Sequence, residues 1–193
     1  FDPDAAAALL DDAGWVVGAD GLRTASGVEG AEEGTPLRLG FLHFPSFGRY
    51  GELLRAELGA VGIDLTLKSL DPPVFAETVF TNRDFDMNII SYCHGPDPEI
   101  GVRRMFDSAQ IGPVPFSNAA AYRDPAVDAL FNEARQTVDL SARGEIYREI
   151  SETVIAAQPY VWVVETSSVR GYRLPCTGFQ AYAQFARAVT CAP

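Results

Sequence analysis

The chain has 193 residues, of which 47% are hydrophobic and 21% charged, a composition typical of a folded globular protein. Its formal net charge of -11 argues against nucleic acid as a partner, because an acidic surface repels phosphates. No stretch reaches the roughly 20 apolar residues of a membrane-spanning helix. The chain starts at Phe1 without an initiator Met or a signal peptide, so we expect a piece of a longer protein.

A helix is predicted at the start of the chain. Asp2 can cap it with Pro3 at its first position, and Gly14 is typical of its end. Leu9, Leu10 and Ala13 are expected on its inner face. Residues 18–36, rich in Gly and polar residues, predict a loop or loose hairpin.

A strand, a helix and a second strand are expected next. Residues 37–44 predict the first strand, and apolar residues at helical spacing over 47–61 predict the helix, which Gly62 ends. Residues 63–68 alternate between apolar and polar, as in a half-exposed strand. This order is typical of a parallel crossover.

A second crossover follows, with a helix over residues 71–82 and a strand over 86–92. The continuous apolar run in this strand predicts burial on both faces. The carboxyl ends of parallel strands meet at one edge of a sheet, where ligands bind. Three loops are therefore expected to converge there: residues 43–46, 69–72 and 91–97.

The rest of the chain predicts helices and one further strand. A short helix is expected up to residue 106, then irregular chain over 107–121, then two helices capped by Asp124 and Ser141. Residues 160–165 read as a strand. Together these elements predict one α/β domain with a mostly parallel central sheet flanked by helices.

The chemistry of the loop at 91–97 indicates binding more than catalysis. His43 and His94 are too few for a metal site without a third ligand, so we expect no metal and no cofactor. Cys93 and His94 are adjacent and point to opposite faces of an extended chain, so they do not form a nucleophilic dyad. GxSxG and glycine-rich phosphate loops are absent from the sequence.

Several side chains near this loop are candidates for ligand binding, each with a structural alternative. Tyr92 can present its ring to a ligand or pack in the core. Asp97 can face a cationic group or cap a helix. Arg103 can hold a ligand carboxylate through two hydrogen bonds or lie on the surface.

Cys176 and Cys191 bracket a tail rich in Gly and aromatic residues. In an exported protein they could form a disulfide, which for a loop of about 15 residues is worth about 3 kcal/mol in the chain-entropy model. The alternative, two independent cysteines, stays open.

Five segments in order resemble the extracellular solute-binding proteins of family 5, which serve ABC importers of peptides, nickel chelates and related solutes. The segments are FDPDAAAALLDDAGW, RAELGAVGIDLTL, NRDFDMNIISY, PDPEIGVRRMF and the long run from YRDPAVDALF to QPYVWVVE. The resemblance implies one lobe of a two-lobed, type II periplasmic-binding-protein-like receptor that closes on its solute. Residues 1–174 would be the ligand-binding lobe, the third domain of the receptor. Residues 175–193 would be a tail that returns toward the missing amino-terminal lobe.

The resemblance also bears on the site. The segment PFSNAAAYRDP resembles a family loop near the cleft and adds Asn118 and Tyr122 as candidates. The loop after Tyr92 is one residue shorter than in peptide-binding relatives, with His94 and Gly95 as the nearest counterparts of a residue that holds the ligand's amino group.

The leading hypothesis is the solute-binding component of an ABC importer, not an enzyme, that captures small peptides or similar polar solutes. Its partners would be the solute, the permease subunits and the missing amino-terminal lobe, with no nucleic acid. It would act outside the cytoplasm, in the periplasm or on the cell surface, where a lipid anchor could hold it. The alternatives are a small α/β enzyme with His94 and Asp97 as acid and base, and a non-catalytic interaction domain.

Overall fold

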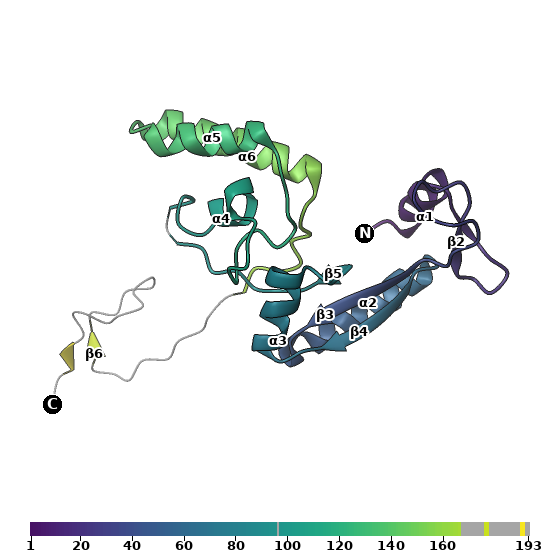
Figure 1. Ribbon diagram of the computed structural model, residues 1–193. Coiled ribbons are helices and arrows are strands. Elements are labelled where there is room, and N and C mark those ends of the chain that lie inside the picture. The colour runs from purple at the N-terminus through teal and green to yellow at the C-terminus, as the bar shows by residue number, and fades with distance from the viewer. Residues whose placement is uncertain (96, 167–175, 178–189, 192–193) are drawn as a thin grey trace. The chain divides into compact units, whose positions relative to one another are not determined.

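The computed structural model describes residues 1–95, 97–166, 176–177 and 190–191, and the chain divides into two compact units, residues 1–159 and 160–193. Strands and helices alternate in the first unit, around a parallel sheet (Figure 1). The predicted α/β class is therefore confirmed. The functional boundary at residue 174 stays a prediction.

The first helix, α1 (Pro3–Asp12), begins where the sequence indicates, because the Asp2 carboxylate accepts a hydrogen bond of 2.9 Å from the backbone N–H of Ala5. Its expected inner face is largely wrong, since Leu9 is 69% exposed, Ala13 is exposed, Leu10 is only half-buried and α1 contains no buried residue. The strands β1 (Trp15–Val17) and β2 (Arg23–Ala25) follow as an antiparallel pair.

A buried arginine, rather than an apolar face, attaches α1 to its surroundings. Arg23 is 2% exposed, and its Nε donates to the backbone oxygen of Val61 at 2.7 Å. Its Nη1 pairs with Asp11 at 2.5 Å and donates to the Trp15 carbonyl, while Nη2 donates to the Ala7 carbonyl at 3.2 Å. One guanidinium thus joins α1, β1 and the end of the helix that precedes Gly62.

The predicted crossover is present as β3 (Arg38–His43), α2 (Gly48–Ala60) and β4 (Asp64–Ser69). A short 3₁₀ turn, Pro45–Phe47, leads into α2. The two strands are parallel, with Arg38 opposite Asp64 and His43 opposite Ser69. Gly62 turns the chain from α2 into β4 at a φ of +86°, and a Cβ there would lie 2.8 Å from Cγ of Arg23, so only glycine fits.

The second crossover passes through α3 (Pro72–Ala76), which continues as the π-helical segment Glu77–Asn82. Phe75, Val79 and Phe80 are buried on its inner side. The chain then enters β5 (Met87–Asn88), which pairs in parallel with β3 and gives the sheet order β4-β3-β5.

The strand expected over residues 86–92 is much shorter than predicted, since only Met87–Asn88 pair, and both residues are half-buried. One more backbone hydrogen bond to β3 follows, from the N–H of Ile89 to the carbonyl of Leu42 at 3.0 Å, and the chain then leaves the sheet. Ile89 and Ile90, the rest of the apolar run, are half-buried.

The remaining helices of the first unit are α4 (Arg103–Phe106), the 3₁₀ turn η3 (Ser108–Gln110), α5 (Pro125–Gln136) and α6 (Leu140–Ala157). The Asp124 cap of α5 is confirmed. The cap predicted for α6 is wrong, because Asp139, not Ser141, accepts a hydrogen bond from the N–H of Ala142, at 2.8 Å. Helices α5 and α6 pack together, and their buried side chains are Val127, Phe131, Ala134, Ile150 and Val154.

In the second unit, residues 160–165 do not form the predicted strand. No described strand pairs with them, and their apolar side chains are exposed, from 82% for Val161 to 53% for Val163. The strands β6 (Cys176–Thr177) and β7 (Thr190–Cys191) form an antiparallel pair. Throughout the described residues, no helix is long and apolar enough to cross a membrane.

Candidate functional site

The loop that follows β5, residues 91–95 and 97, is the centre of the candidate site and is called the β5 loop. It leaves the sheet at the edge where β3 and β4 also end, because all three strands are parallel. His43 ends β3, but it is only 6% exposed and its Nδ1 lies 2.8 Å from the backbone oxygen of Phe44. His43 is therefore a buried structural residue at this edge of the sheet.

Four rings form a row from the core to the surface, which we call the aromatic row: Phe80, Phe116, Tyr92 and His94. Phe80 is buried and lies 6.2 Å from Phe116, measured between ring centroids. Tyr92 meets Phe116 edge to face at 6.3 Å and lies parallel to His94 at 6.4 Å. Because His94 is exposed and Phe116 is 41% exposed, this row offers aromatic surface to a ligand.

Phe116 is a member of the site that the sequence did not predict. It lies in the irregular segment before α5, at a φ of 62°, in the left-handed region that non-glycine residues seldom adopt. Periodicity gives no signal in such a segment, so only its contacts with Phe80 and Tyr92 identify it.

Tyr92 is also joined to the segment that contains Asn118. The Tyr92 hydroxyl donates to the backbone oxygen of Ser117 at 3.0 Å. Asn118 is 0% exposed, its Nδ2 donates to the carbonyls of Tyr122 (2.8 Å) and Asp107 (3.3 Å), and its Oδ1 accepts from the N–H of Tyr122 at 3.0 Å. The amide of Asn118 thus fixes the chain around it.

Tyr122 lies edge to face with Phe106, with 6.4 Å between ring centroids, and its hydroxyl donates to Oδ2 of Asp124 at 3.2 Å. Burial first, and then the hydrogen bond to this carboxylate, raise the pKa of Tyr122 above its ordinary value. The hydroxyl is therefore a neutral donor at physiological pH.

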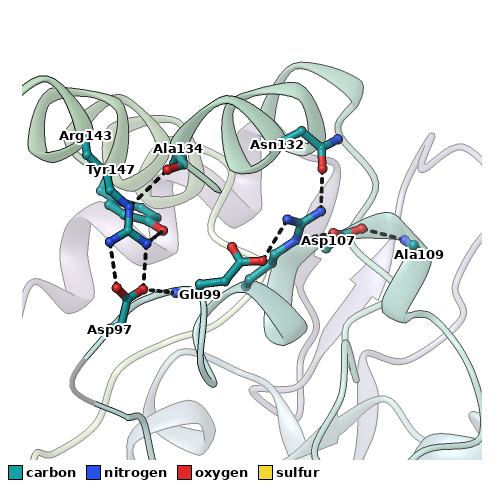
Figure 2. Close-up of polar contacts among 9 residues, drawn as sticks. Asp97, Glu99, Asp107, Ala109, Asn132, Ala134, Arg143 and Tyr147 are labelled. Carbon is teal, nitrogen blue, oxygen red and sulfur yellow. Dashed lines mark hydrogen bonds and ion pairs between the residues drawn. The ribbon is translucent and has the colours of Figure 1, made fainter. Parts of the chain in front are cut away.

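Asp97 is held by a clamp from α6 (Figure 2). Arg143 donates to both carboxylate oxygens, at 2.6 and 2.7 Å, and also to the carbonyl of Ala134 and the hydroxyl of Tyr147, each at 3.0 Å. The Arg143 hydrogen bonds, followed by one from the N–H of Glu99, lower the pKa of Asp97 to about 2. The carboxylate is ionised at neutral pH and already neutralised by its partner.

Arg103 is likewise surrounded by protein partners. Its Nε donates to Asp107 at 2.7 Å, its Nη1 to Glu99 at 3.0 Å and its Nη2 to Asn132 at 2.7 Å. Burial lowers the pKa of this guanidinium, but the two carboxylates outweigh burial and raise it above the ordinary value. A ligand carboxylate would have to displace one of these three groups.

The structure brings the six predicted residues into one chain of contacts. Glu99 connects Asp97 with Arg103, and Asp107 connects Arg103 with Asn118. Asn118 binds Tyr122, and the neighbouring Ser117 binds Tyr92, which stacks on His94. Their ligand roles stay predictions.

Two other features of the described residues bear on chemistry. Cys93 is an exposed, free thiol beside His94. In the part of the chain that the structure describes, no group of three or more His, Cys, Asp or Glu side chains is placed to hold a metal ion.

Several known proteins similar to this chain are named as binding proteins of transporters. No family model matches the sequence. Protein XP55 of Streptomyces lividans is 25% identical over 84% of the chain, and a Brucella ovis protein named as an ABC transporter peptide-binding protein is 25% identical over 90%. The chain covers 28% and 32% of these two proteins, respectively, so it spans about a third of their length or less.

Solved structures show the same fold. NikZ from Campylobacter jejuni, in complex with Ni(L-His), matches 82% of the chain with a TM-score of 0.70 and 22% identity. The oligopeptide-binding protein AppA from Bacillus subtilis, in complex with a nonapeptide, matches 83% with a TM-score of 0.70 and 20% identity. In both cases the chain covers 31% of the solved protein.

Proposed function

We propose that this chain is one part of the solute-binding component of an ABC importer. Its resemblance to family 5 solute-binding proteins supports this proposal. It would capture small peptides or similar small polar solutes outside the cytoplasmic membrane and deliver them to permease subunits. Because the chain covers about a third or less of its relatives, an amino-terminal lobe of the same protein would supply the other wall of the cleft.

The observation that carries this proposal is the aromatic row at the end of β5. Ligand sites are typically apolar and aromatic, with a few polar groups that fix orientation. Tyr92 and His94 each combine an aromatic ring with a polar group. Their rings are stacked, and His94 is exposed. We assign direct solute contact to these two rings. Asp97 and Asn118, whose polar atoms are bonded within the protein, would position the loop.

An enzymatic role for His94 and Asp97 is not favoured. An acid catalyst must hold a proton near neutral pH, whereas Arg143 lowers the pKa of Asp97 to about 2. The same pairing makes this carboxylate a poor base, because abstraction of a proton would cost its two hydrogen bonds to Arg143. The relatives are named for binding, which agrees with a non-catalytic function.

The test is to produce the complete receptor, including the upstream lobe, and to identify co-purified solutes by native mass spectrometry. A peptide library is then screened by thermal shift, and affinities are measured by calorimetry. Tyr92→Ala is expected to weaken binding at least tenfold. Tyr92→Phe keeps the ring and removes the hydroxyl that donates to Ser117, so it is expected to bind within about threefold of wild type.

Two results would contradict the proposal. One is a complete receptor that is persistently empty and shows no thermal shift with any peptide or small polar solute. The other is tight solute binding by the present chain alone, because a single wall of the cleft is expected to bind weakly.

A further inference from the structure

We propose that Cys176 and Cys191 form a disulfide that closes the carboxyl-terminal tail at the base of the β6–β7 pair. The two strands are antiparallel, with Cys176 opposite Cys191 and Thr177 opposite Thr190 (Figure 1 labels β6). The side chains of both cysteines lie outside the described part of the structure, so the inference rests on the backbone register and on the sequence.

The register meets the geometric requirement for a disulfide. Residues directly opposite each other in an antiparallel pair have Cα atoms about 4.5–5.5 Å apart. Disulfides join residues whose Cα atoms lie roughly 4.4–6.8 Å apart. Of the three cysteines in the chain, only these two face each other across a described strand pair.

The position of the pair within the ribbon gives the bond a structural purpose. Cys176 is the first residue of β6 and Cys191 the last of β7, so the bond would lie at the end of the ladder remote from the connecting chain. A two-stranded ribbon is at best marginally stable in water, and this one is two residues long on each side. A covalent cross-link at its base would keep the strands paired.

The reaction is an ordinary thiol oxidation. The two S–H bonds of the cysteines and the S–S bond of a disulfide oxidant break, and one S–S bond forms between Cys176 and Cys191. The two electrons and the two protons pass to the oxidant, which becomes two thiols. The strand register makes the reaction local, whereas Cys93, an exposed free thiol in the first unit, has no such pairing. Only the oxidising surroundings depend on the proposed location of the protein.

The test uses the complete chain and supplies its own oxidant. The purified protein is equilibrated with oxidised and reduced glutathione, alkylated with iodoacetamide and digested with trypsin without reduction. Cleavage after Arg173 and Arg187 separates the two cysteines into peptides 174–187 and 188–193. We expect these peptides to appear linked by mass spectrometry, and we expect one free thiol per chain with Ellman's reagent in denaturant.

Two variants serve as controls. Cys93→Ser is expected to leave no free thiol and to keep the linked peptides. Cys176→Ser is expected to have two free thiols and no link. Three free thiols in the wild-type protein, or a disulfide that joins Cys93 to Cys176 or Cys191, would overturn the inference. Because no solute is involved, this result and the test of the transport role can fail independently.

Discussion

Replacement of Asn118 by alanine tests whether this predicted ligand residue is in fact part of the framework of the site. Its side chain is 0% exposed and makes three hydrogen bonds, two to Tyr122 and one, at 3.3 Å, to Asp107. A hydrogen bond of this kind contributes about 1 kcal/mol net, and the long one less. The truncation also strands a buried N–H and two carbonyls. We therefore expect Asn118→Ala to lower the free energy of unfolding by about 2–3 kcal/mol.

Urea unfolding followed by circular dichroism measures this loss. Asn132→Ala is the matched control, because Asn132 is exposed and makes one side-chain hydrogen bond, to Arg103. It is expected to change the free energy of unfolding by no more than about 0.5 kcal/mol. If Asn118→Ala unfolded like the control, the buried amide would be dispensable for folding. The structural role assigned to it here would then be refuted.

Two further predictions concern charged groups. Arg23→Met should lower the free energy of unfolding, measured in urea, by about 3 kcal/mol, because three backbone carbonyls lose a buried donor. The exposed control Arg38→Met should lower it by less than about 0.5 kcal/mol. Equal losses in the two variants would refute the reasoning. The pKa of Asp97 should be about 2 by NMR titration and rise toward its ordinary value in Arg143→Ala, where the hydrogen bond from the N–H of Glu99 still lowers it. Since folding lowers this pKa, the ion pair stabilises the fold above about pH 4, and its contribution is lost as the pH falls toward 2. A pKa near 4 for Asp97 in the wild-type protein would contradict the clamp by Arg143.

The first crossover could be predicted from the sequence because every local signal agrees. The residues of β4 alternate between apolar and polar, α2 has apolar residues at helical spacing, and Gly62 stands where a positive φ is required. The observed bounds of β3, α2 and β4 lie within one or two residues of those expected. Short-range patterning was sufficient here because both strands pair within the same unit.

The strand at β5 could not be predicted in the same way. A continuous apolar run reports hydrophobicity, but not how many neighbouring strands are available to pair with it. The register pairs with β3 end at Asn88, the N–H of Ile89 makes one more bond to the carbonyl of Leu42, and the chain then continues into the β5 loop. The misplaced cap of α6 has a more local cause, since Asp139 and Ser141 are both good capping residues and lie two positions apart.

The candidate site illustrates a further limit of sequence reasoning. Tyr92, His94 and Asp97 were found because they follow a predicted strand. The partner that fixes Asp97, Arg143, lies 46 positions away on α6, and no periodicity connects the two. Long-range ion pairs depend on how helices pack, so a carboxylate that looks available to a ligand in the sequence can be fully occupied in the fold.

These contacts separate the residues that shape the β5 loop from those that can recognise a solute. Asp97 is anchored to α6, and Asn118 is buried, so exchange of either would disturb the backbone before it altered recognition. Tyr92 and His94 differ, because their rings extend the aromatic row outward and His94 is exposed. Substitutions at these two positions can change the binding surface while the anchors keep the loop in place. Under the proposed function, we therefore expect substitutions at Tyr92 and His94 to change solute preference, and substitutions at Asp97 and Asn118 to change stability.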